Sequence, residues 1–191
     1  QQVLSSLERP HRALVDADPT TAGNYELLAH LGRGGFAAVY LGVDKNGDLA
    51  AIKFLHTRVA NDSSLRDWFN KEIGLGLRAR GSYTPRIFAA DLMASRPWVA
   101  MEFINGPSLA DFVMAQGPLP SRLLVPFAGQ TIRAVIDIHR TGVIHLDLNP
   151  RNILLTRTPP NIRIVDFGLS QSVGGTGVSD SRSRASMRGF L

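Results

Sequence analysis

The chain has 191 residues, of which 44% are hydrophobic, and it contains no cysteine. This composition is typical of a folded protein rather than a disordered one, and it excludes disulfides and thiolate metal sites. The formal net charge of +5 comes mainly from arginine, because only three of the 21 basic residues are lysines. The arginines are scattered, and no aromatic residues are interleaved with them. We therefore expect no nucleic-acid partner.

The first half of the chain predicts a tail followed by strands and one helix. Residues 1–24 are polar without a sustained period, and we expect a tail or linker there. Residues 25–43 have a strand-type composition interrupted by glycines, and the apolar run LAAIKFL forms the next expected strand. KNGD, between these strands, predicts a hairpin turn, because Asn-Gly adopts the positive φ angles that such turns need. Either Asp62 or Ser63 can cap a helix over about 65–80.

The second half predicts mainly helices. After two short strands in RIFAADL and PWVAMEFI, the segment GPSLADFVMAQG predicts a short helix capped by Ser108 and ended by Gly117. PSRLLVPFAGQTIRAVIDIHRTG predicts a long amphipathic helix, because its apolar residues recur at helical spacing. Small strands flank VIHLDLNPRNILL and NIRIVDFG. From Ser170 the chain is rich in Ser, Gly and Arg, which predicts a mobile loop.

Two features of the first half could hold phosphate. LGRGGFAAV places Gly32, Gly34 and Gly35 between strands, where the backbone can approach a polyphosphate closely, although a plain hairpin turn has the same pattern. It is not the dinucleotide fingerprint, because a strand and not a helix follows. Lys53 lies in an apolar strand, where it either holds phosphate oxygens or extends its head to solvent. Glu72, 19 residues later, is its best candidate partner.

Two polar motifs of the second half could carry chemistry. Asp147 and Asn152 form D-x-x-x-x-N two residues after His145. An aspartate there can orient a hydroxyl and accept its proton, and an asparagine amide oxygen can ligate a divalent ion. Asp166 follows an apolar strand in VDFG, where a carboxylate is well placed to bind Mg²⁺ that bridges phosphates. Either motif alone is compatible with a turn.

Together, the glycine-rich loop, the lysine of AIK, the helix glutamate, the H-x-D-x-x-x-x-N loop and D-F-G resemble the protein-kinase family. LGRGGFAAVYLG, VAMEFINGPSLADFV and GPLP are most similar to the catalytic domains of bacterial, eukaryotic-like Ser/Thr kinases. The resemblance implies an α+β, two-lobed fold: an N-lobe of antiparallel sheet plus one helix and the hinge over 25–104, and a partial helical C-lobe over 105–191. It also implies that the sequence stops just before the family's A-P-E segment, so we expect an incomplete C-lobe, with the activation segment starting at Ser170.

The resemblance implies ATP as phosphate donor, Mg²⁺ as cofactor and a role for each matching residue. Met101 would be the gatekeeper, and the backbone of 102–104 would contact adenine. The expected catalytic residues are Asp147, Lys53, Glu72 and Asn149, and the expected metal ligands are Asn152 and Asp166. The expected ATP-binding residues are Leu31, Gly32, Arg33, Gly34, Gly35, Phe36, Ala37, Val39, Ala51, Lys53, Met101, Glu102, Ile104 and Leu154.

Four departures from the family pattern bear on activity. Ala37 replaces a glycine of the loop, which we expect to matter little. Leu146 replaces the arginine that pairs with a phosphorylated activation segment. Asn149 replaces the lysine that neutralises the transferring phosphate. Gly76 stands where an apolar residue usually packs against the phenylalanine of D-F-G, and it and Gly74 should each cost the helix on the order of 1 kcal/mol relative to alanine.

These features predict an ATP- and Mg²⁺-dependent protein kinase that phosphorylates Ser or Thr hydroxyls of protein substrates, itself included. The alternative is a pseudokinase that binds nucleotide or acts as a scaffold, which Leu146, Asn149 and Gly76 favour. A small-molecule phosphotransferase also uses H-x-D-x-x-x-x-N, but Pro150 and the complete D-F-G argue against it. No apolar run approaches the ~20 residues that span a bilayer, so we expect no membrane segment and a cytoplasmic location, with an anchor beyond Leu191 left open.

Overall fold

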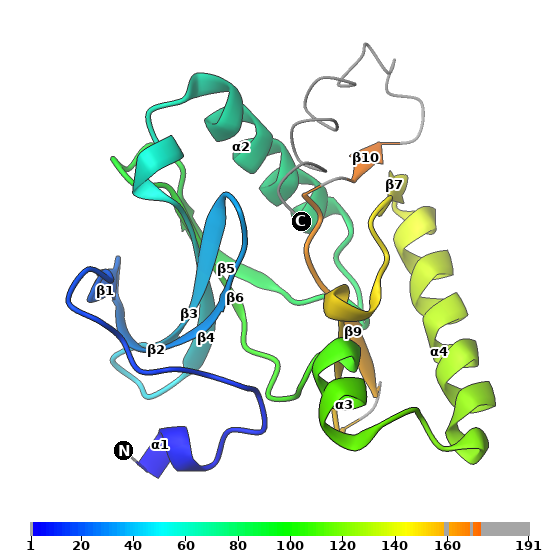
Figure 1. The fold of residues 1–191 in the computed structure, drawn as a ribbon. Helices are drawn as coiled ribbons and strands as arrows, with labels where there is room; N and C mark the ends of the chain where they lie inside the picture. The colour runs from blue at the N-terminus through cyan, green and yellow to red at the C-terminus, as the bar shows by residue number, and fades with distance from the viewer. Residues whose placement is uncertain (1, 159–160, 169, 173–191) are drawn as a thin grey trace.

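The computed structural model describes residues 2–158, 161–168 and 170–172, and these residues form two lobes (Figure 1). One lobe is a curled antiparallel sheet with helix α2 (Ser63–Arg78) at its side. The other contains α3 (Leu109–Gln116), α4 (Ser121–Arg140) and two short strand pairs. The predicted α+β, two-lobed arrangement is therefore confirmed.

The sheet of the first lobe has six strands in the order β1-β2-β3-β4-β6-β5. Their bounds are Thr21–Ala22 (β1), Tyr25–Arg33 (β2), Ala37–Val43 (β3), Leu49–Leu55 (β4), Ile87–Asp91 (β5) and Trp98–Glu102 (β6). The predicted turn between β3 and β4 is present, but of the Asn-Gly pair only Gly47 has a positive φ, of 89°, and Asn46 does not. The Asp44 carboxylate accepts hydrogen bonds from the backbone N–H groups of Asn46 and Asp48, at 2.8 and 2.9 Å, and so stabilises this turn.

Helix α2 begins at Ser63, after the 3₁₀ turn η1 (Thr57–Val59). Asp62 caps it by accepting hydrogen bonds from the N–H groups of Ser64 and Leu65, at 2.9 and 3.2 Å. The prediction placed its ends about two residues too late, which is the usual uncertainty of a helix boundary. Phe69 and Ile73 lie on its buried face and pack against the sheet, so that the helix is held at a fixed side of the cleft.

The second lobe is held together by apolar contacts between α4 and the short strands. These strands are β7 (Val143–Ile144), β8 (Ile153–Leu155), β9 (Ile162–Ile164) and β10 (Gln171–Ser172), and the 3₁₀ turn η2 (Pro150–Asn152) precedes β8. Ala134 and Ile138 of α4 are buried against β7, β8 and β9. Ser108 and Asp111 form the capping box of α3, and the helix ends at Gly117, at φ 80°, as predicted.

The chain passes from the first lobe to the second through residues 103–108, where Gly106 lies directly against β8. A Cβ atom at Gly106 would come within 1.7 Å of the carbonyl oxygen of Leu155, so the close approach of these two segments requires glycine.

One face of α4 is apolar and exposed. Leu124, Val125, Ile132 and Ile136 are 50%, 82%, 60% and 44% exposed, respectively. Within the described ranges, none of the helices combines the length and the hydropathy that a bilayer-spanning segment needs.

The expected activation segment falls mainly on residues 173–191, which lie outside the described residues. Its beginning is described: Ser170 donates a hydrogen bond to the carbonyl oxygen of His145, at 3.0 Å, and β10 pairs with β7. The start of this segment is therefore tied to the loop that contains Asp147.

Candidate active site

A cleft of about 460 Å³ lies between the two lobes. It is lined by Asp147, Lys53 and Glu72 of the expected catalytic residues, by both expected metal ligands, and by every expected ATP-binding residue except Leu31. Asn149 does not line it either. The structure therefore brings together residues that are far apart in the sequence, from the glycine-rich loop to D-F-G.

Lys53 is the cation of the cleft wall. It lies on β4 and is 8% exposed, between strands β3 and β6. Its ammonium forms ion pairs with the Glu72 carboxylate and with Oδ1 of Asp166, the latter at 3.3 Å. Burial alone would lower the pKa of Lys53, but the two carboxylates outweigh this and raise it above its ordinary value. Lys53 is therefore positively charged at any physiological pH.

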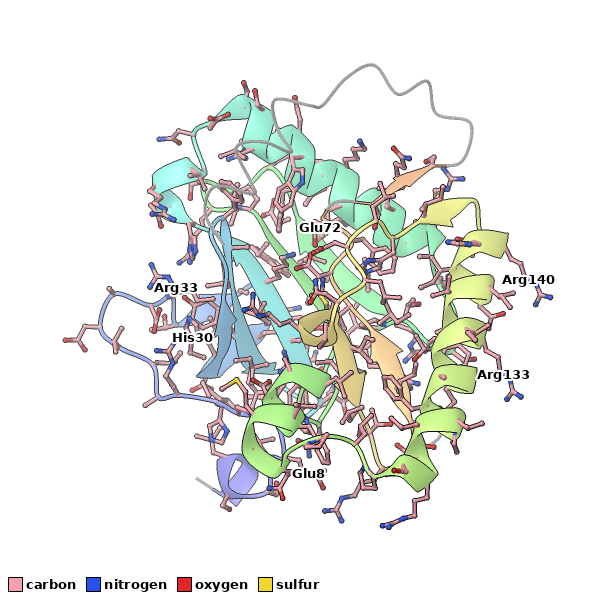
Figure 2. All side chains as sticks on the ribbon, turned by 45° about the vertical axis from the view of Figure 1, so that its right-hand side comes forward. Glu8, His30, Arg33, Glu72, Arg133 and Arg140 are labelled. Carbon is pink, nitrogen blue, oxygen red and sulfur yellow. The ribbon has the colours of Figure 1, made fainter. Side chains whose placement is uncertain are left out.

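Glu72 points from α2 towards the region where the two lobes meet (Figure 2). It is 8% exposed, and its second carboxylate oxygen, Oε2, is buried without a hydrogen-bond partner among the described residues. Burial raises the pKa of Glu72 to about 7, although the Lys53 ammonium favours the charged form. This carboxyl therefore titrates near neutral pH.

Asp166 is the second carboxylate at Lys53, and it adopts a left-handed backbone conformation with φ 67°. Its side chain is 47% exposed, which leaves it accessible from the cleft. The Lys53 ammonium lowers the pKa of Asp166, assisted by a hydrogen bond from the N–H of Gly168 at 3.2 Å. Asp166 therefore presents a charged carboxylate to the cleft.

His145 contacts both the loop that contains Asp147 and the segment that contains D-F-G. Its Nε2 lies 3.1 Å from the carbonyl oxygen of Val165, and its Nδ1 lies 3.4 Å from the N–H of Asp147. These partners assign the proton to Nε2, since the carbonyl must receive a donor and the N–H needs an acceptor. Burial lowers the pKa of His145, so the ring is neutral. It also packs against Phe167, which links the loop to D-F-G.

Asp147 and Asn152 are fixed to one another across this loop. The amide nitrogen of Asn152 donates to the backbone oxygen of Asp147 at 2.9 Å and to its carboxylate Oδ2 at 3.2 Å. The amide oxygen of Asn152 is thereby turned away from these acceptors. Leu146, immediately before, has φ 61°, which is a strained conformation for a side chain of this size.

Asn149 is engaged within the loop itself. Its amide oxygen accepts a hydrogen bond from the N–H of Arg151 at 2.9 Å, and its amide nitrogen donates to the backbone oxygen of Asp147 at 3.1 Å. Asn149 is thus the cap of η2, whereas Arg151 lines the cleft.

The residues present fit a hard divalent cation. Asp166 and Asn152 both line the cleft with oxygen donors of the kind that Mg²⁺ prefers. No cluster of three or more His, Cys, Asp or Glu side chains suited to a metal occurs in the part of the chain that the structure describes. A cation at this place would therefore take its remaining ligands from phosphate and water.

The glycine-rich loop leaves room at its tip. A Cβ atom at Gly32 or Gly35 would meet nothing within 4 Å, so packing within the chain does not require glycine at these positions. The loop is nevertheless anchored, because Gly34 donates its N–H to Ala37 at 2.8 Å and accepts from Nε2 of His56 at 2.9 Å. Open space beside an anchored backbone suits a close ligand such as a phosphate.

Among the cleft-lining residues that sequence reasoning missed are Arg9 and Trp68. Trp68 donates its indole N–H to the carbonyl oxygen of Gly168 at 2.6 Å and so ties α2 to D-F-G. A signal was available, since Trp68 lies four residues before Glu72 and therefore on the same helix face. Arg9 gave no such signal, because it lies in the segment expected to be a tail.

Comparison with known proteins agrees with this geometry. The protein kinase domain model matches residues 25–186. The chain is 35% identical over 163 residues to the serine/threonine-protein kinase AfsK of Streptomyces coelicolor and 33% identical over 168 residues to the probable serine/threonine-protein kinase PkwA of Thermomonospora curvata. These matches cover 85% and 88% of this chain but only 20% and 22% of the relatives, so the chain spans about a fifth of their length. The predicted resemblance is confirmed: the chain belongs to the protein kinase domain family.

Proposed function

We propose that this chain binds Mg-ATP in the cleft between its lobes and transfers the γ-phosphate to Ser or Thr hydroxyls of protein substrates, itself included. The single observation that carries this is the Lys53 ammonium, buried between Glu72 and Asp166 in the wall of a cleft that the glycine-rich loop also lines. A buried cation that faces an open, glycine-lined cavity is suited to polyphosphate oxygens.

The nucleotide would lie across both lobes. Val39 and Ala51 of the sheet and Leu154 of β8 line the cleft and would enclose the adenine ring, next to the hinge residues 102–104. Lys53 would hold the phosphates, with Glu72 fixing its position. Mg²⁺, held by Asn152 and Asp166, supplies positive charge at the phosphates when it is bound.

Asp147 is the proposed catalytic carboxylate. Asn152 fixes it by hydrogen bonds to its backbone oxygen and to Oδ2, so Oδ1 is the oxygen left to orient an acceptor hydroxyl and take its proton. Asn149 is uncharged and occupied as the cap of η2, so the transferring phosphate would depend on Lys53 and the bound Mg²⁺ for positive charge. Since ATP is a cytoplasmic substrate, we place this activity in the cytoplasm.

A pseudokinase is the second candidate, and the geometry of Asn149 favours it. Both polar groups of its side chain are bonded to the loop backbone, so this position brings no charge to a transferring phosphate. A pseudokinase would still bind nucleotide through Lys53, and would transfer no phosphate. Binding and transfer therefore need separate measurements.

Calorimetric titration of Mg-ATP into the purified protein tests the binding step. We expect Lys53→Met to weaken binding by roughly 10- to 100-fold, since a charge-assisted contact typically contributes about 1.5–3 kcal/mol. Lys45→Met is the matched control, because Lys45 is an exposed lysine on the turn between β3 and β4. Equal affinities of the wild type and Lys53→Met, or no binding by the wild type, would refute the assignment.

A further inference from the structure

The segment before the sheet, residues 6–18, is fixed to the second lobe at its beginning. Asn105, just after the hinge, accepts hydrogen bonds from the N–H groups of Glu8 and Arg9, at 2.8 and 3.4 Å. The Glu8 carboxylate forms an ion pair with Arg157 at 2.8 Å. Figure 2 shows Glu8 between α1 (Gln2–Ser5) and α3. The segment therefore lies along the outer side of the hinge.

The same segment is fixed to the sheet farther along. Arg12 and His30 of β2 exchange two backbone hydrogen bonds, at 2.9 and 2.8 Å. The Asp18 carboxylate accepts hydrogen bonds from the N–H of Val15 at 3.0 Å and from the Tyr40 hydroxyl at 2.8 Å. Residues 6–18 thus bridge the two lobes (Figure 1). Arg9 lies between the two sets of anchors.

The side chain of Arg9 enters the cleft. It is one of the lining residues, and its Nη1 is buried without a hydrogen-bond partner among the described residues. A buried N–H group that lacks an acceptor is unfavourable, and such groups in native proteins are usually completed by water or by a ligand. Burial lowers the pKa of Arg9, an effect that the nearby Asp111 carboxylate opposes, and a guanidinium keeps its charge in either case. Arg9 is therefore a charged donor in the lining of the cleft, and its guanidinium is not fully paired among the described residues.

The anchors of Arg9 decide which end of the cleft it faces. Its backbone is bonded to Asn105, immediately after the hinge, and Asp111 lies in the first turn of α3. The proposed phosphate site is built from Lys53 and Asp166, on β4 and after β9. A nucleotide whose base lies at the hinge and whose phosphates lie at Lys53 places its sugar beside the start of α3. Among the acceptors of such a nucleotide, the sugar oxygens would therefore lie nearest to Arg9.

We propose that the guanidinium of Arg9 donates a hydrogen bond to the sugar of a nucleotide bound in the cleft, which makes residues 6–18 part of the nucleotide site. This inference rests on the proposed nucleotide binding, and it adds a binding residue outside the matched kinase domain, which begins at residue 25. It also gives the bridging segment a role in ligand recognition.

Calorimetry with two ligands, adenosine and Mg-ATP, tests this contact. Arg9→Met keeps the aliphatic stem and removes the donors, so we expect it to weaken both ligands by the same factor, about tenfold. Arg12→Met is the matched control, because Arg12 belongs to the same segment and is exposed, and its hydrogen bonds with His30 are made by the backbone. We expect this control to bind both ligands as the wild type does.

Each other outcome contradicts the inference in a recognisable way. Equal affinities of wild type and Arg9→Met for both ligands would show that Arg9 does not contact the nucleotide. The proposed nucleotide site would be unaffected by this result. Tighter binding would mean that Arg9 occupies space that the ligand needs, and a loss confined to Mg-ATP would move the contact to the phosphates. If the wild type binds neither ligand, the proposed function is refuted as well. If Arg9→Met does not fold, Arg9→Lys decides, since it keeps the charge but loses the guanidinium fork and should still weaken both ligands.

Discussion

The amide nitrogen of Asn149 donates a hydrogen bond to the backbone oxygen of Asp147, at 3.1 Å, while the amide oxygen of Asn149 caps η2 through the N–H of Arg151. The position that carries a lysine in related kinases thus has a structural task here. Substitution at Asn149 therefore has two separable effects, one on the loop and one on charge.

Asn149→Ala removes both hydrogen bonds and adds no charge. We expect it to lower the free energy of unfolding by about 1–2 kcal/mol, since each such bond contributes about 1 kcal/mol net. Denaturant unfolding of wild type and variant measures the difference. An unchanged free energy of unfolding would mean that solvent replaces the cap without cost.

Asn149→Lys loses the same bonds and adds a positive charge, so Asn149→Ala is its matched reference. If the loop lacks charge at the transferring phosphate, turnover of Asn149→Lys should exceed that of Asn149→Ala by roughly 10²-fold, the size of one electrostatic contact at a transition state. Steady-state phosphorylation of a generic Ser/Thr protein substrate provides the measurement. Equal turnover of the two variants would indicate that Arg151 already supplies the charge.

The two glycines of α2 form a second matched pair. A Cβ atom at Gly74 would meet nothing within 4 Å, so Gly74→Ala should stabilise the protein by about 1 kcal/mol through helix propensity alone. At Gly76 the same atom would lie 3.9 Å from Phe167 and 3.3 Å from Cδ1 of Ile87, the flexible end of a side chain. We expect Gly76→Ala to stabilise at least as much, as measured by denaturant unfolding. A lower stability of Gly76→Ala would show that the Ile87 side chain cannot move away from the added Cβ atom.

The raised pKa of Glu72 predicts a pH dependence of stability. The folded protein keeps the Glu72 proton up to pH of about 7, whereas the unfolded chain releases it near the ordinary value of 4.5. Between these values the folded state binds more protons, so this group's contribution to the free energy of unfolding falls as pH rises. The difference in the free energy of unfolding between wild type and Glu72→Gln, measured from pH 4.5 to 8, gives the contribution of Glu72. A difference that rises with pH would mean that the ion pair with Lys53 keeps Glu72 charged throughout.

Two isoleucines of α4 should respond differently to truncation. Ile138 is 2% exposed and packs against the strands of the second lobe, so Ile138→Ala should cost about 2–5 kcal/mol. Ile132 is 60% exposed, so Ile132→Ala should change the free energy of unfolding by less than about 0.5 kcal/mol. Thermal or denaturant unfolding provides both values. A large loss at Ile132 would show that this side chain is covered in solution.

The exposed face of α4 should also promote self-association. Val125 and Ile132 are 82% and 60% exposed, and apolar surface of this kind favours aggregation. Val125→Glu combined with Ile132→Lys should therefore lower the light scattering of concentrated protein. The face would have no such role if wild type and double variant stayed equally monodisperse.

Local sequence signals predicted much of the fold. Asp62, Ser108 and Gly117 each act within a few residues of their position, so the pattern alone was sufficient to place α2 and α3. The cap at Asn149 was not predicted, although Asn followed by Pro150 is a frequent turn initiator. The expected lining of the cleft came from the resemblance to the protein kinase family that the combined motifs carry, and the structure brings these residues together, apart from Leu31 and Asn149.

Contacts between distant, aperiodic segments were not predictable in this way. Arg9 reaches the cleft only because Asn105 and His30, at different places in the fold, hold its segment on both sides. The polar composition of residues 1–24 carries no trace of these partners. Likewise, no local pattern predicts that Oε2 of Glu72 is buried without a hydrogen-bond partner among the described residues.

Phosphoryl transfer by the purified protein, measured with γ-labelled ATP and Mg²⁺ as label incorporated into the protein itself, tests the central claim most directly. Asp147→Asn is the decisive variant, because it keeps the shape of the side chain and removes the carboxylate that would take the hydroxyl proton. Titration with Mg-ATP shows that both proteins still bind nucleotide and so separates transfer from binding. We expect labelled Ser or Thr in the wild type and none in Asp147→Asn. Nucleotide binding without label in the wild type, or equal label in both proteins, would contradict the account.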